Sequence, residues 1–189
     1  MEKKPQKSFA ETARAAFPVA DRALAEQAIS HLTPLVDDTR RHPTSEFDVL
    51  GQKIRLPSRL HFPRLLATDA NIENMPQSAL CLISCSTDGY LRQKAIYLLL
   101  KTETSWVAPY VTVLAAEYVL EIAEIICDGL PTLNRAIYAN FVLENRAPIR
   151  TLRARATSYW DAYHRHLYPE KKDYPGLKAL HEMERWAAA

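Results

Sequence analysis

Glycine is scarce in this sequence, which has only four glycines among 189 residues. Tight β-turns and phosphate-binding loops depend on glycine, because it adopts backbone conformations that other residues avoid. The sequence therefore argues against an all-β protein and against a nucleotide-binding loop. It also contains no Walker-type loop, no dinucleotide fingerprint and no nucleophile elbow. No motif of these kinds indicates an enzyme.

Cysteine is scarce as well, and Cys81, Cys85 and Cys127 show no disulfide-framework spacing. Cys81 and Cys85 would share one face of a helix, which does not readily bring two cysteines into disulfide geometry. No set of cysteines and histidines completes a zinc site. We interpret the cysteines as small buried hydrophobic residues in a reducing cytoplasm. The basic N-terminus is not followed by an apolar run, so we expect no secretory signal peptide.

A large charge of one sign is absent too, since the formal net charge is only +2. This value does not indicate nucleic-acid binding. The charge is unevenly distributed, however. Residues 101–145 contain two basic and six acidic residues, a net charge of −4, whereas residues 146–172 contain seven basic and two acidic residues, a net charge of +5. Either these segments neutralise each other within the fold, which we prefer, or one of them forms a charged docking face.

What the sequence does have is helical periodicity, and we predict a mainly α-helical protein of about eight helices. The expected arrangement is a short HEAT-like or irregular helical bundle. We divide the chain into an N-terminal helical segment (1–43), a connector (44–74) and a helical body (75–189) that together form one compact domain. Alternating apolar residues around Gly51 predict a small β-hairpin near 47–56. Ser8 and Glu11 match a capping box that begins the first helix.

The nearly apolar stretch 106–128 carries Glu117, Glu121 and Glu124 at helical spacing. Three interpretations arise: a membrane span, a carboxylate metal site, or the core helix of a soluble protein. Each carboxylate near the middle of a membrane would cost about 2.5–3.5 kcal/mol. A soluble helix avoids this cost by turning the glutamates to one edge. We therefore predict one long buried helix with an acidic row along its second half, and no membrane association.

A helical di-metal site would need Glu-x-x-His pairs from two helices, and this sequence contains none. The nearest match is Asp161 with His164, so we expect neither a metal nor another cofactor. Arg150, Arg153, Asp161 and His164 share one face of a predicted helix, and this face could meet the acidic row. The hypothesis of an enzyme places its cavity among six of these residues: Glu117, Glu121, Glu124, Arg150, Asp161 and His164.

Arg55, Arg59 and Arg64 form a basic cluster around the predicted hairpin. Such a cluster suits phosphate groups, but we prefer the explanation that these are solvated loop residues. The cluster lacks the alternation of aromatic and basic residues that single-strand binders use. We therefore do not favour nucleic acid as a partner, but keep weak binding of nucleic acid or another anion at these arginines as a further alternative.

The segment "DGYLRQKAIYLLL" at 88–100 resembles the second helix of a HEAT-type repeat. HEAT-type proteins are mostly binding scaffolds, and the resemblance implies that role alone. The segments "LPSRL", "LRQKAI", "WVAPYV" and "EYVLEI" together resemble a bacterial family of helical proteins. That second resemblance implies no activity. Our leading hypothesis is a non-enzymatic interaction protein with an unknown protein partner, and we keep a homodimer open as one assembly.

Overall fold

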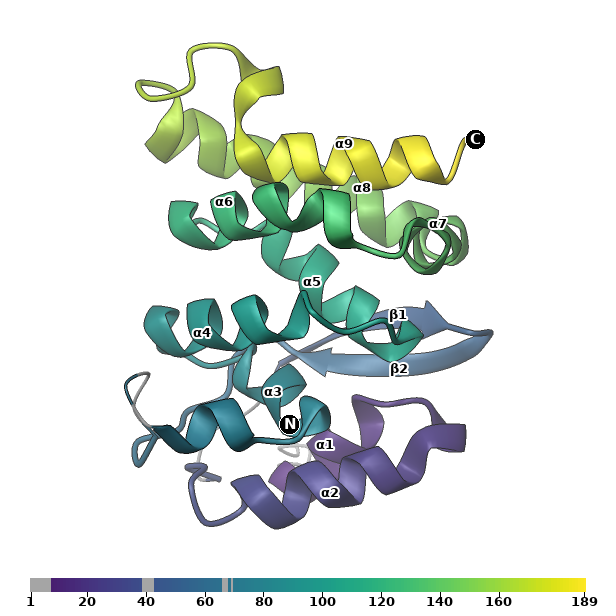
Figure 1. Cartoon of the computed structure of the whole chain (residues 1–189), viewed down its shortest axis with the longest axis vertical. Helices are drawn as coiled ribbons and strands as arrows, with labels where there is room; N and C mark the ends of the chain where they lie inside the picture. Colours follow the sequence, from purple (N-terminus) through teal and green to yellow (C-terminus); the bar gives the residue numbers. More distant parts are fainter. Residues whose placement is uncertain (1–7, 39–42, 66–67, 69) are drawn as a thin grey trace, which may run out of the picture.

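The computed structural model describes residues 8–38, 43–65, 68 and 70–189. It is mainly helical with one small two-stranded sheet, which confirms the predicted fold class. Figure 1 shows the chain rising through stacked layers, from α1 and α2 at one end to α8 and α9 at the other. The elements are α1 (Phe9–Ala15), α2 (Arg22–Leu32), β1 (Thr44–Val49), β2 (Gln52–Pro57), α3 (Gln77–Ile83), α4 (Gly89–Leu99), α5 (Ala108–Ala115), α6 (Leu120–Gly129), α7 (Arg135–Glu144), α8 (Arg146–Tyr159) and α9 (Pro175–Trp186).

The first helix begins at the predicted capping box. The Ser8 hydroxyl accepts a hydrogen bond from the Glu11 backbone N–H, and the Glu11 carboxylate accepts one from the Ser8 N–H. These bonds satisfy two backbone donors that a helix start leaves open. α1 then buries Phe9 and Ala13, which join one hydrophobic core that continues through the molecule as far as Met183 on α9.

The β-hairpin forms where the alternating pattern predicted it, with strands that reach outward to Thr44 and Pro57. Leu50 and Gly51 make its turn with positive φ angles of 52° and 71°. A two-residue turn of this kind matches the right-handed twist of the strands. Asn145, at the start of α8, holds the hairpin by accepting from the Asp48 N–H (2.8 Å) and donating to the Asp48 carbonyl (2.7 Å).

The prediction of one long helix over 106–128 is wrong. α5 ends at Ala115 and α6 begins at Leu120, so residues 116–119 interrupt the helix; the longest described helix is α8, with 14 residues. The cause is tertiary packing, because α9 crosses against the end of α5. A Cβ atom on Gly176 of α9 would lie 2.4 Å from the Ala115 carbonyl oxygen, so only glycine allows this approach.

Within the described part of the chain, no helix is long and apolar enough to cross a membrane. The interruption after α5 is part of the reason, since it divides the apolar stretch into two short helices. Cys81 lies on α3 and Cys85 follows it. Both are buried in the core as free thiols, as the sequence predicted.

Candidate functional site

The interruption between α5 and α6 is held by side chains that come from the far end of the sequence. Arg155 on α8 donates to the Val113 carbonyl (2.9 Å) and the Ala116 carbonyl (3.0 Å). The Tyr174 hydroxyl donates to the Glu117 carbonyl (3.3 Å), and His164 Nε2 donates to the Tyr118 carbonyl (2.9 Å). These donors satisfy carbonyl groups that the end of α5 leaves without helical partners. The break is therefore stabilised by tertiary hydrogen bonds.

Glu117 turns its carboxylate into the core at this break and is only 3% exposed. Its Oε2 lies 2.6 Å from Nη2 of Arg59, which follows the hairpin, and 3.8 Å from Nη2 of Arg92 on α4. A buried carboxylate is stable only when it is paired, so these two arginines explain why Glu117 is tolerated in the core. We call Arg59, Arg92 and Glu117 the charged junction.

Arg92 is the more unusual member of the charged junction, since it is 1% exposed. Its Nη1 donates to the Ser86 carbonyl (2.9 Å) and the Thr87 carbonyl (3.2 Å). Its Nε and Nη2 donate no hydrogen bond to any residue that the structure describes. Each unsatisfied buried donor costs about 1–3 kcal/mol. Within the described residues, the charged junction therefore leaves two buried donors of Arg92 without a hydrogen-bond partner.

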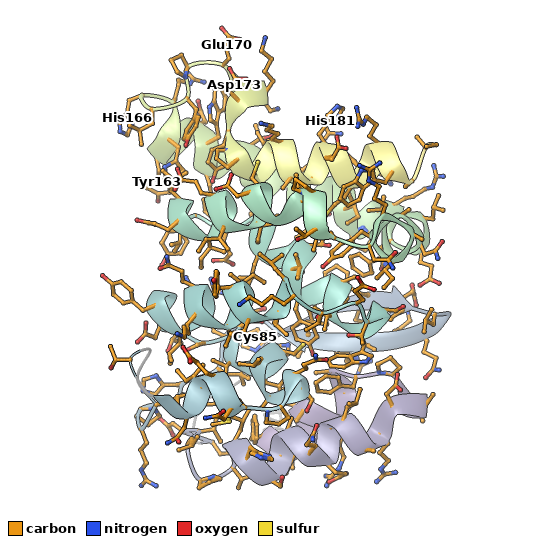
Figure 2. All side chains as sticks on the ribbon, viewed as in Figure 1. Cys85, Tyr163, His166, Glu170, Asp173 and His181 are labelled. Atoms are coloured by element: carbon orange, nitrogen blue, oxygen red, sulfur yellow. The ribbon has the colours of Figure 1, made fainter. Side chains whose placement is uncertain are left out.

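A cavity of about 40 Å³ lies against the charged junction. It is bounded by the hairpin, the end of α3, α5 and α8. Its polar side chains are Ser45, Ser58, Arg59, Ser84, Cys85, Tyr110, Glu117 and Arg155, and its apolar wall includes Phe47, Leu56, Val113 and Leu114. Cys85, labelled in Figure 2, lies at mid-height in the molecule. We call this space the central cavity.

Cys85 does not make the central cavity a nucleophilic site. Burial raises the pKa of its thiol to about 12, although Arg59 acts in the opposite direction. A thiol with so high a pKa is protonated at neutral pH, and the thiolate is the form that attacks. The Tyr110 hydroxyl is not a nucleophile either, since it donates to the Ala16 carbonyl (2.8 Å) and burial raises its pKa. The chemistry available is therefore hydrogen bonding and charge pairing.

The structure does not gather the predicted acidic row and basic face into one site. Glu121 is exposed, whereas Glu124 accepts from the Tyr168 hydroxyl (2.9 Å). Asp161 pairs with Arg165 in its own helical segment. Arg153 pairs with Glu184 of α9 (3.1 Å), so the predicted pairing of Arg153 with the acidic row is not what the structure shows. The six residues proposed for an enzyme cavity therefore divide between different surroundings, with Glu117 alone of them lining the central cavity.

The three arginines proposed for anion binding also separate. Arg55 pairs across the hairpin with Glu46 (2.8 Å), Arg59 enters the charged junction, and Arg64 donates to the Pro34 carbonyl (3.2 Å). Each guanidinium group thus has an internal partner. No group of three or more His, Cys, Asp or Glu side chains suited to a metal ion occurs in the described ranges.

A second candidate site lies between α8 and α9, on the outer layer of the stack. Two adjoining hollows of about 440 and 340 Å³ share Arg153 as a lining residue. Their acidic side chains are Glu170 and Glu184. Their basic side chains, apart from His181, are Arg146, Arg150, Arg153, Lys171, Lys172 and Lys178. We call the two hollows together the α8–α9 groove.

Most cations of the α8–α9 groove have no ion-pair partner among the described residues. Arg153 is paired with Glu184, but none of the other five basic side chains lies within ion-pair distance of a described carboxylate. Figure 2 shows Glu170 and His181 on the outer side of this layer, at the end of the molecule farthest from α2. The groove is not uniformly polar, because Val142, Ile149 and Leu177 also line it. It is a positively charged groove with apolar patches.

Sequence reasoning missed three residues around the break: Arg92 of the charged junction, and Arg155 and Tyr174, which donate to carbonyl groups at the break. Arg92 lies within the segment that resembles a HEAT-type repeat, yet its pattern gave no sign of its pairing with Glu117. Arg155 was counted among the charges of residues 146–172, without any indication that it binds α5 carbonyls. No family model, curated protein or solved structure matches this chain.

Proposed function

We propose that this protein is an interaction protein that binds an acidic segment of a partner protein in the α8–α9 groove. The observation that carries the proposal is the excess of unpaired cations over carboxylates in that groove. Exposed cations without internal partners add little to stability, since even paired surface charges contribute only about 0–1 kcal/mol. They do attract and orient an oppositely charged partner.

The groove favours a peptide over a nucleic acid for a physical reason. Single-stranded nucleic acid binds where bases stack on aromatic rings. The residues lining the α8–α9 groove include no aromatic ring other than the His181 imidazole. Aliphatic side chains such as Ile149 and Leu177 instead suit the apolar residues of a peptide, and the surrounding lysines and arginines suit its carboxylates.

The experiment is a fluorescence-anisotropy titration with a labelled peptide that alternates glutamate pairs with leucine. We expect saturable binding that weakens between 50 and 300 mM salt. The reason is that the Debye length is about 10 Å at 0.1 M salt and becomes shorter as salt is added, so attraction between the peptide and the groove is screened more strongly. Reversal of two unpaired cations, with Lys171→Glu and Lys172→Glu together, should weaken binding by about tenfold if each contact is worth about 0.7 kcal/mol.

The matched control is Arg22→Glu, which reverses a largely exposed charge on α2 in the opposite layer. It should leave the affinity for the acidic peptide unchanged. A single-stranded oligonucleotide of equal charge is the competing probe. Tighter binding of the oligonucleotide, or equal loss of peptide affinity in the Arg22 variant, would contradict the proposal.

Other expectations from the sequence stay predictions. The HEAT-type resemblance agrees with a scaffold role, and the α3–α4 pair that contains it packs as two neighbouring helices. The homodimer and the cytoplasmic location stay predictions as well. A native mass spectrum would report the number of copies and any retained ligand together.

A further inference from the structure

We infer that a hollow between α4 and α6 binds a small amine, a molecule whose apolar body carries one protonated amino group. The hollow has a volume of about 550 Å³, within the range of about 300–1,000 Å³ that is typical of small-molecule sites. Six of its lining residues carry the argument: Tyr97, Leu100, Lys101, Glu103, Ile125 and Asp128. We call this space the α4–α6 hollow. It shares no lining residue with the α8–α9 groove, so the site is independent of the proposed function.

The ends of two helices form the apolar wall of the α4–α6 hollow. Tyr97 lies on α4 and Leu100 directly follows that helix, whereas Ile125 lies on α6. The two helices pack against each other in adjoining layers of the stack (Figure 1). Gly129 permits the close approach, because a Cβ atom on it would lie 3.0 Å from Leu100 Cδ1. Tyr97 is 52% exposed, and Leu100 and Ile125 are half-buried, so this apolar surface is open to a ligand.

The charges of the hollow select a cation. Glu103 and Asp128 are exposed, and neither carboxylate lies within ion-pair distance of a described lysine or arginine. Among the described lining residues, Lys101 supplies the positive charge, so the lining has one cation, two carboxylates and a net charge of −1. A ligand ammonium group would therefore be attracted by the lining, and a ligand carboxylate would be repelled.

Asp128 is also placed where a helix favours a positive charge. It lies in the last turn of α6, and that turn contains no basic residue. The C-terminal end of a helix carries about −0.5 elementary charge from its unpaired carbonyl groups, so a carboxylate there is unfavourable and a cation is favourable. A bound ammonium group would compensate both the Asp128 carboxylate and the helix end. This position is a second, independent sign that the hollow binds a cation.

Lys101 shows that the wall of the hollow accepts an ammonium group. Its Nζ lies 4.4 Å from the centroid of the Tyr97 ring, which is a cation–π contact. Lys101 is exposed, so its ammonium group can leave the ring for water when a ligand arrives. Lys101 therefore competes with the amino group of the ligand. Its removal should have the opposite effect from the removal of a carboxylate.

The probe is phenethylamine, which joins an aromatic ring to an amino group that is protonated at neutral pH, as a lysine side chain is. 2-Phenylethanol is the decisive comparison, because it has the same size and lacks only the charge. The experiment is an NMR titration of the ¹⁵N-labelled full chain with each compound, at neutral pH and one ionic strength. We expect saturable shifts at Leu100, Ile125 and Asp128. The amine should bind about fourfold more tightly than the alcohol if each carboxylate contributes about twofold. Equal affinities, or no saturable shifts with phenethylamine, would overturn the inference.

Two substitutions of exposed residues should change the ratio of amine affinity to alcohol affinity in opposite directions. Asp128→Asn removes one carboxylate and should lower the ratio by about twofold. Lys101→Met removes the competing ammonium group and should raise the ratio. Glu121→Gln is the matched control, since Glu121 is exposed on the same helix and does not line the hollow. An equal change in the Asp128 and Glu121 variants, or a ratio that does not rise in Lys101→Met, would contradict the inference.

Further compounds test the charge and the size of the ligand. Phenylacetate reverses the charge and should give no saturable shifts, and methylamine, which lacks the apolar body, should give none either. A peptide of alternating lysine and leucine is the competing probe. If it bound at the same residues more than about tenfold tighter than phenethylamine, the hollow would belong to a basic segment of a partner protein, and the inference would be wrong. Because none of these variants alters the α8–α9 groove, binding of the acidic peptide there reports independently on the proposed function.

Discussion

Glu117→Gln should destabilise the protein far more than a typical substitution of a glutamate. The change keeps the size and shape of the side chain and removes only its charge. Arg92, which is 1% exposed, would then keep a buried positive charge without an anion. Breaking a buried ion pair by removing one partner costs about 3–5 kcal/mol. The glutamine oxygen can still accept from Arg59, so we expect a loss near 3 kcal/mol.

The assay is urea unfolding followed by the fluorescence of the three tryptophans. With a urea dependence of about 1–3 kcal/mol per M, a loss near 3 kcal/mol lowers the midpoint by about 1–3 M. The control is Glu121→Gln, which alters an exposed side chain and should stay within about 0.5 kcal/mol of the parent.

A second variant separates the missing charge from other effects of the substitution. Arg92→Met combined with Glu117→Gln removes both buried charges, and replacing both partners is often close to neutral. The double variant should therefore be more stable than Glu117→Gln alone. The reasoning is refuted if Glu117→Gln costs less than about 1 kcal/mol, or if the two substitutions destabilise additively.

Three further predictions address other parts of the fold. Burial raises the pKa of the Cys85 thiol from an ordinary 9.0 to about 12. The stability that this protonated thiol contributes is therefore present below pH 9 and is lost as the pH rises toward 12, with a loss of about 2 kcal/mol at pH 10.5. The urea midpoint of Cys85→Ala should therefore fall less than that of the parent between pH 8 and pH 10.5. Asn145→Ala removes both bonds to Asp48 and should cost about 2–3 kcal/mol, with amide hydrogen exchange accelerating in the hairpin more than in α2. Gly176→Ala should lower the melting temperature by several degrees, because its Cβ would meet the Ala115 carbonyl, whereas Gly89→Ala meets nothing closer than 3.8 Å and should not.

Local sequence signals predicted the parts of the fold that local interactions determine. The capping box at Ser8 needs only residues three positions apart, and the hairpin around Gly51 needs only alternation and a turn. Asp88 illustrates the limit of such signals: an Asp-Gly pair is typical of a turn, yet the Asp88 side chain begins α4 by accepting from the Tyr90 N–H (2.8 Å). Boundaries of this kind shift by a residue or two because caps and turns use the same residue types.

The charged residues were harder to interpret, because their partners are distant in the sequence. Glu117 was grouped with Glu121 and Glu124 on the assumption of one continuous helix, and that assumption fails at residues 116–119. Its actual partner Arg59 lies 58 positions earlier. Helical periodicity describes neighbours within one helix and contains no information about ion pairs between layers.

The break after α5 links the fold to both candidate sites. A continuous helix would direct Glu117 by the 3.6-residue period, toward the face it shares with the exposed Glu121. The break directs it inward, where Arg59 and Arg92 stabilise it. Arg155 on α8 stabilises the break by donating to the Val113 carbonyl. The same helix also contributes Arg146, Arg150 and Arg153 to the α8–α9 groove. α8 therefore has two roles: its inner side completes the central cavity, and its outer side presents cations to solvent.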